Sequence, residues 1–295
     1  MKMFYVKMLA VIFTIAAFIG VNSLSAFAAE PDWANKVVQV TGMGAQPANA
    51  VNPAQARMMA RRAAVDDAYR QLAESIKGVN VDAETTVENM MVTSDVINTK
   101  VSACIQGAVV ISERELPGGG YEVTMTVPLF GVTNSLAQAV IPQTTVVEPL
   151  PTPIPEVIPS MPAGSLQGGT IIYTTIDSGK KSPMEAIGGY TGVIIDCRGL
   201  ALNPVMSPII KNDKGISIYG HKNLNYDKIV AEGMVSYASS ASQASRAGSN
   251  PLVIKAISLM DHNANPVIST ADANRILIEN STSNFLNETR VVFLR

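Results

Sequence analysis

The chain has 295 residues, of which 47% are hydrophobic and 16% are charged. Globular proteins carry about 25% charged residues, so a disordered chain whose charge outruns its apolar content is excluded. With two Cys, two His and a formal charge of −2, the sequence argues against a four-ligand zinc cluster, a multi-disulfide framework and a nucleic-acid partner.

The first 29 residues have the pattern of a secretory signal. Two lysines precede an apolar run over residues 8–21, and residues 26–28 supply a small-residue cleavage pattern. A membrane anchor is the alternative, but the run is shorter than the roughly 20 apolar residues of a spanning helix. We therefore expect cleavage after Ala28 or Ala29 and a soluble, periplasmic or otherwise exported chain with no transmembrane anchor.

Residues 30–140 are predicted to form an α+β domain that begins with a short strand from Val37 to the glycines of residues 41–44. A long helix follows, with Asn52 as its N-cap, Pro53 as its first residue and Gly78 at its end. Helical spacing relates two sets of residues, which are Val65, Tyr69, Leu72 and Ile76, and the small-residue stripe of Ala60, Ala64 and Ala68.

Three later stretches of this domain, at residues 79–84, 109–111 and 121–127, alternate between apolar and polar residues as strands do. The last two flank a Pro-Gly-Gly-Gly turn at residues 117–120 and predict a hairpin. One helix lying across a small, mainly antiparallel sheet is the economical way to bury both apolar faces.

An ordered set of motifs runs through residues 40–87. The set consists of Gly-x-Gly at 42–44, an Ala- and Arg-rich helix segment at 56–64, Asp-Ala-Tyr at 67–69 and Ile-Lys-Gly-Val at 76–79. With it, about residues 36–130 resemble the Lpp-twenty family of bacterial envelope lipoproteins and the related N-terminal domain of flagellar assembly protein T. The resemblance implies an envelope domain with structural or assembly roles and no catalytic centre. Those lipoproteins begin at a lipidated Cys, whereas no Cys lies near the cleavage site predicted here.

A proline-rich segment at residues 141–162 separates this domain from a second one at residues 163–295. Proline removes a backbone donor and fixes φ, so we expect an extended, semi-rigid linker between two distinct bodies. A long surface loop within one domain is the less favoured alternative, because such loops are uncommon in compact folds.

The second domain is predicted to be mixed α/β. Its expected elements are a strand buried on both faces at 192–198, a strand at 204–210, a hairpin through Gly215 to 216–219, a helical stretch at 227–237, a strand at 252–259, a helix at 271–278 capped by Ser269 and Asp272, and a strand at 291–294 that closes the sheet. Segments 190–200, 204–208 and 250–256 are similar to the C-terminal region of other exported proteins with such a first domain, which implies no particular activity.

Asp196 and Arg198 are the candidate site residues. They flank Cys197 at the end of the strand at 192–198, so both side chains are expected on one face as a buried acid beside a buried base. An arginine fork of this kind can hold a carboxylate ligand. The favoured alternative is an ion pair that satisfies two charges at a strand end.

Other chemistry-bearing residues are interpreted as structural. These are His221 and His262 as solvated turn residues, residues 261–265 as a turn rather than a calcium loop, residues 179–182 as an incomplete phosphate loop, Glu113 and Glu115 as solvated strand residues, and Cys104 and Cys197 as two buried, unbridged thiols. The helix arginines Arg57, Arg61 and Arg62 leave two alternatives open, an anion patch or intrahelical pairs such as Arg62 with Asp66.

Together these features predict an exported, non-enzymatic envelope protein without cofactor or metal. Its expected partners are envelope proteins, with the flagellar basal body among them, and a homo-oligomer is a further expectation. The alternative function is a small-ligand-binding protein or enzyme with a cleft around Asp196 and Arg198.

Overall fold

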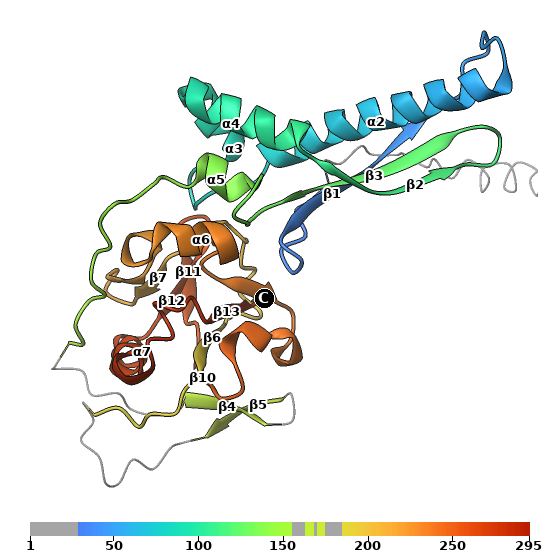
Figure 1. Ribbon diagram of the computed structural model, residues 1–295. Helices are drawn as coiled ribbons and strands as arrows, with labels where there is room; N and C mark the ends of the chain where they lie inside the picture. Colours follow the sequence, from blue (N-terminus) through green and yellow to red (C-terminus); the bar gives the residue numbers. More distant parts are fainter. Residues whose placement is uncertain (1–28, 155–162, 168–169, 175–184) are drawn as a thin grey trace, which may run out of the picture.

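The computed structural model describes residues 29–154, 163–167, 170–174 and 185–295, which form two domains (Figure 1). The predicted signal segment, except for Ala29, and the motif at residues 179–182 lie outside these described residues. Both domains combine helices with sheets, which confirms the predicted α+β class.

The first domain is built on a three-stranded antiparallel sheet. Its strands are β1 (Val37–Gly44), β2 (Val109–Glu115) and β3 (Tyr121–Pro128), in the order β1-β3-β2. The long helix α2 (Pro53–Lys77) lies across one face of this sheet (Figure 1). Asn52 caps the helix by accepting a hydrogen bond from the N–H of Gln55, and Gly78 is its C-cap. The predicted strand, helix and hairpin are therefore confirmed.

Helix α2 approaches strand β1 very closely. Ala60, Ala64 and Ala68 are fully buried on the helix. A Cβ atom added to Gly42 would lie 2.2 Å from the carbonyl oxygen of Ala64, and one added to Gly44 would lie 2.0 Å from that of Ala60, against 3.4–4 Å for an ordinary contact. The two glycines and the alanine stripe together set the distance between helix and strand.

The chain after α2 differs from the prediction. Residues 79–86 form a loop with one isolated bridge between Asn80 and Thr86, so the predicted strand at 79–84 is wrong. The Asp82 carboxylate accepts hydrogen bonds from the N–H groups of Glu84 and Thr85 and turns the chain back on itself. Three helices that were not predicted are α3 (Val87–Thr93), α4 (Asp95–Gln106) and α5 (Leu136–Val140).

The second domain contains a six-stranded mixed sheet in the order β5-β4-β10-β6-β13-β9. The strands are β4 (Ala163–Gln167), β5 (Thr170–Thr174), β6 (Gly192–Asp196), β9 (Ser236–Ala238), β10 (Pro251–Lys255) and β13 (Val291–Leu294). The four from β10 to β9 run parallel, and β6 and β13 are buried along their whole length, as interior strands of parallel sheets are. Strand β13 lies inside the sheet, instead of closing it as predicted.

A four-stranded sheet and two α-helices complete the second domain. They are β7 (Ile210–Asn212), β8 (Ser217–Tyr219), β11 (Ser258–Met260), β12 (Asn265–Ile268), α6 (Tyr226–Glu232) and α7 (Thr270–Ser283), with the strand order β11-β12-β7-β8. The predicted hairpin through Gly215 is confirmed. The predicted cap is confirmed as well, because the Ser269 hydroxyl accepts a hydrogen bond from the N–H of Asp272.

Three predicted elements of this domain need correction. Residues 204–209 carry no strand, and two of them are prolines that lack the N–H a ladder requires. The helical stretch ends at Glu232, because Gly233 leaves the helix with a φ of 75°. The strand at 252–259 is divided between two sheets: the N–H of Ala256 donates to the backbone carbonyl oxygen of Asp196 in β6, whereas the N–H of Ile257 donates to that of Val267 in β12.

The described part of the linker, residues 141–154, contains no helix or strand, as predicted. It is nevertheless held against the second domain. The N–H of Glu148 donates to the carbonyl oxygen of Lys222 at 2.8 Å. The Asn274 side chain on α7 both donates to and accepts from the backbone of Ile154, each at 2.8 Å.

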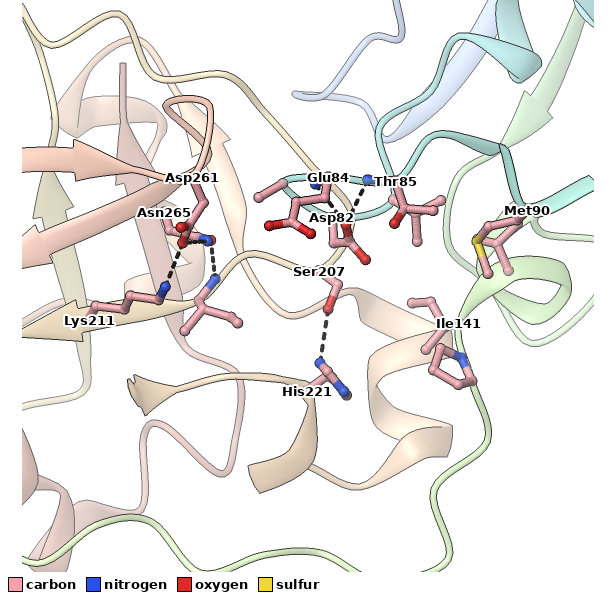
Figure 2. A pocket seen from close by; sticks show the side chains of 15 residues that line it. Asp82, Glu84, Thr85, Met90, Ile141, Ser207, Lys211, His221, Asp261 and Asn265 are labelled. Carbon is pink, nitrogen blue, oxygen red and sulfur yellow. Dashed lines mark hydrogen bonds and ion pairs between the residues drawn. The ribbon is translucent and has the colours of Figure 1, made fainter. Parts of the chain in front are cut away.

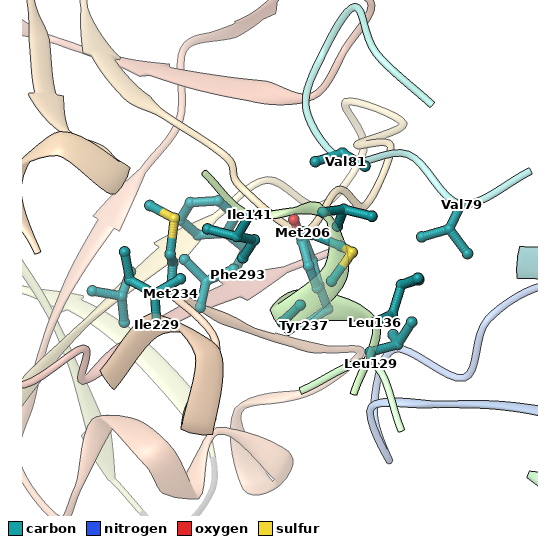
Figure 3. Close-up of a cluster of buried hydrophobic side chains, with 14 of the residues drawn as sticks. Val79, Val81, Leu129, Leu136, Ile141, Met206, Ile229, Met234, Tyr237 and Phe293 are labelled. Atoms are coloured by element: carbon teal, nitrogen blue, oxygen red, sulfur yellow. The ribbon is translucent and has the colours of Figure 1, made fainter. Parts of the chain in front are cut away.

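The two domains share one hydrophobic core, although they were predicted as distinct bodies. The buried residues drawn in Figure 3 include Val79, Val81, Leu129, Leu136 and Ile141 from the first half and Met206, Ile229, Met234, Tyr237 and Phe293 from the second. Backbone hydrogen bonds reinforce the contact, from Met206 N–H to Asn80 at 3.0 Å and from Ser207 N–H to Val81 at 2.8 Å.

Candidate functional site

Asp196 lies at the end of β6 and is buried, as predicted. The Arg198 guanidinium donates to both of its carboxylate oxygens, at 2.8 Å from Nε and 2.7 Å from Nη2. Because 45% of the Arg198 side chain is exposed, the expectation of a buried base is wrong. The geometry is that of an ion pair at a strand end, and a ligand role for these two residues stays a prediction.

The arginines of α2 pair across elements. Arg57 binds Glu115 and Arg61 binds Glu113, each at 2.8 Å from Nε to a carboxylate oxygen. Both glutamates lie on β2 and are exposed, as expected. These pairs tie the helix to the hairpin, so neither open alternative, a free anion patch or pairing along the helix, describes Arg57 and Arg61.

The expectations for the cysteines and for the turn at residues 261–265 are confirmed. Cys104 and Cys197 are buried and form no disulfide. Burial raises the pKa of Cys104 to about 11 and that of Cys197 to about 12, so both are held as thiols. Residues 261–263 have φ values of 53° to 64°, which is the geometry of a tight turn.

A cleft of about 420 Å³ opens where the two domains meet (Figure 2). Domain interfaces are preferred places for small-ligand sites, and this volume falls within their usual range of roughly 300–1,000 Å³. The first domain contributes residues 81–85, Met90 and Val140, and the start of the linker contributes Ile141 and Pro142. The second domain contributes Ser207, Ile209, Lys211, His221, Asp261 and Asn265.

One end of the cleft is occupied by a closed polar network. The Asp261 carboxylate accepts hydrogen bonds from Lys211 Nζ at 2.6 Å and from Asn265 Nδ2 at 2.7 Å. The Asn265 side-chain oxygen accepts from the N–H of Ile209 at 2.8 Å. The bond from Lys211 is the main cause that lowers the pKa of Asp261, which keeps this residue ionised.

Ser207 and His221 face each other across the middle of the cleft (Figure 2). The Ser207 hydroxyl lies 3.4 Å from His221 Nδ1, beyond the roughly 2.6–3.2 Å expected between a nucleophile and its base. Burial lowers the pKa of His221 below its ordinary value of 6.5, so the imidazole is neutral at pH 7. The pair is therefore a neutral polar surface, and His221 is half-buried rather than the solvated residue expected.

A second candidate surface is the outer edge of strand β2, which pairs only with β3 among the described strands. Val109, Val110 and Ile111 on this edge are 57%, 39% and 51% exposed. A register shift between Val110 and Ser112 marks a bulge at Ile111. Exposed edges with unpaired backbone groups and apolar side chains are templates for an added strand.

Within residues 29–154, 163–167, 170–174 and 185–295, no three His, Cys, Asp or Glu side chains are grouped so as to hold a metal ion. None of the helices in these ranges combines the length and apolar character needed to cross a bilayer.

Two stretches of the chain match known protein families. Residues 31–128, the helix-on-sheet domain, match the LPP20 lipoprotein family, which confirms the resemblance to the Lpp-twenty family. The chain is thus similar to envelope lipoproteins through its first domain. Residues 192–295 match the second domain of Treponema pallidum Tp0624. No curated protein matches the chain.

Most residues of the cleft carry no signal in the sequence. The sequence favours turns at His221 and Asp261, a strand at Asp82 and a family-like segment at Ser207, and no pattern there indicates a binding role. They come from a loop of the first domain and from separate segments of the second, and only the docking of the two domains brings them together.

Proposed function

We propose that this chain is an exported, non-enzymatic component of the bacterial cell envelope that acts by binding other proteins during assembly of an envelope structure. The LPP20 match of the first domain supports an envelope role. The flagellar basal body is the first candidate structure, because the sequence also resembles the N-terminal domain of flagellar assembly protein T.

The observation that carries this proposal is the open edge of β2. Its apolar half, residues 109–111, is exposed, and the charges of its other half are already paired. Arg114 of β2 is paired as well, because its guanidinium donates two hydrogen bonds, of 2.8 and 3.1 Å, to the carboxylate of Glu122 on β3. Edge strands are protected by charged side chains, proline or bulges; the first half of β2 has the bulge at Ile111 but neither a charged residue nor a proline. The occupant we assign is an extended segment of another envelope protein, added as a fourth strand.

A photo-crosslinking amino acid at position 111, expressed in the native host, tests the assignment. We expect one envelope protein to be crosslinked reproducibly, and to be lost when Val110→Lys places a charge on the edge. Val92, which is 83% exposed on α3, supplies the matched control, because Val92→Lys should leave the crosslink intact. Crosslinks to a second copy of this chain alone, or a product that survives Val110→Lys, would refute the assigned partner.

A further inference from the structure

The interdomain cleft has two chemically different ends. Met90 and the start of the linker at Ile141 and Pro142 form an apolar end. Asp82 and Glu84 of the loop at residues 79–86 lie toward the polar end, beside the Asp261 network (Figure 2). A ligand that fills the cleft from one end to the other therefore meets an apolar wall and then acidic groups.

The acidic groups retain acceptor capacity. Asp82 uses Oδ1 for the N–H groups of Glu84 and Thr85, at 2.9 and 2.8 Å. Its Oδ2 atom and the whole Glu84 carboxylate have no hydrogen-bond partner among the described residues. An ionised carboxylate can accept about four hydrogen bonds, so each of these groups can take a further donor.

The positive groups of the cleft do not neutralise those carboxylates. Lys211 is already bound to Asp261 at 2.6 Å. His221 is neutral at pH 7, as argued above from its burial. With Asp82, Glu84 and Asp261 against Lys211, the lining carries an excess of negative charge.

We propose that this cleft binds a primary ammonium or guanidinium group carried on an apolar stem. The cation lies against Asp82 and Glu84, where charge-assisted hydrogen bonds are formed. The stem lies along Met90, Ile141 and Pro142 and is removed from water. The inference rests on the residues of the cleft and not on the edge of β2, so it does not depend on the proposed function. The chemistry fits a free amine as well as a lysine or arginine side chain of a bound peptide.

Titration calorimetry of the purified mature chain with four probes tests the ligand class. The probes are hexylamine, hexanol, hexanoate and a terminally blocked Ile-Arg-Pro tripeptide. We expect hexylamine or the tripeptide to bind at least about tenfold more tightly than hexanol, and hexanoate to bind most weakly, because the carboxylates repel it. Binding of hexylamine alone assigns the cleft to a small amine, and binding of the tripeptide alone assigns it to a basic side chain of a partner.

The double variant Asp82→Asn with Glu84→Gln tests the residues. Asn keeps the side-chain oxygen that holds the turn, so the loop should stay folded while both charges are removed. We expect a loss of about tenfold or more in affinity for the cationic probe. Glu88→Gln, on α3 just outside the cleft, is the matched control and should bind as the wild type does.

Three outcomes would overturn the proposal. They are equal binding of hexanol and hexylamine, unchanged affinity in a correctly folded double variant, and the absence of binding by both cationic probes at millimolar concentration. Circular dichroism of each variant establishes whether it is folded.

Discussion

Substituting Gly42 by alanine should force helix α2 away from strand β1. The added Cβ would lie 2.2 Å from the carbonyl oxygen of Ala64 and 2.4 Å from the nitrogen of Ala68. An ordinary contact begins at 3.4 Å, so the helix must retreat by roughly 1.2 Å. No rotamer change can relieve this clash, because both opposing atoms belong to the backbone.

We expect Gly42→Ala to lower the free energy of unfolding by about 3 kcal/mol, the upper end of the usual range for overpacking. For a chain of this size that corresponds to a fall in melting temperature of roughly 6–12 °C. Urea and thermal unfolding followed by circular dichroism at 222 nm measure both quantities.

Gly78→Ala is the matched control. This C-cap glycine has a φ of −76°, which alanine adopts freely, and an added Cβ would meet its nearest neighbour at 3.6 Å. Its stability should therefore stay the same or rise by up to about 1 kcal/mol. A Gly42→Ala variant that unfolds within about 0.5 kcal/mol of the wild type would refute the close packing of α2 on β1.

Three further predictions concern buried polar groups. Arg246→Met should destabilise the protein by about 3 kcal/mol in urea unfolding, because it removes the guanidinium that donates to the backbone and hydroxyl oxygens of Thr289 and leaves buried acceptors unpaired; a loss below about 1 kcal/mol would contradict this. Cys197 should resist Ellman's reagent at pH 8 and react on unfolding, because burial raises its pKa to about 12; rapid labelling of the native chain would show that the thiol is accessible. Burial raises the pKa of Asp272 above its ordinary 3.8, so the folded state binds its proton more tightly than the unfolded state and the associated stability is lost as pH rises above 3.8. The Asp272→Asn variant should therefore have a higher free energy of unfolding than the wild type at pH 7, and this difference should shrink toward pH 3.5. A difference that grows on acidification would show that folding lowers the pKa of Asp272 instead of raising it.

Elements that are encoded within a few neighbouring residues could be predicted from the sequence. Asn52 followed by Pro53 fixes the start of α2, and Ser269 does the same for α7. The glycine-rich turn at residues 117–120 fixes the hairpin of β2 and β3. In each case the residues that make the sequence pattern also make the cap or the turn themselves, without a distant partner.

Elements decided by distant partners could not be predicted in this way. The alternation at residues 79–84 is typical of a strand, yet the Asp82 carboxylate closes a turn there. The carbonyl oxygen of Val81 accepts a hydrogen bond from Ser207 of the second domain instead of from a neighbouring strand. Residues 252–259 have uniform β character, so the sequence predicts one strand. The break between Ala256 and Ile257 arises because their N–H groups donate to strands of two different sheets. The cleft could not be predicted for the same reason, because its lining residues come together only when the two domains are docked.

The continuous core also bears on how such a protein can evolve. If the chain were cut at the linker, the first domain would expose Leu129 and Leu136 to water, and the second would expose Met206 and its neighbours. Exposed apolar surface of this kind promotes aggregation. Recombination that exchanged one half for an unrelated domain would therefore require a replacement with a complementary apolar surface. This favours inheritance of the two halves as a single unit.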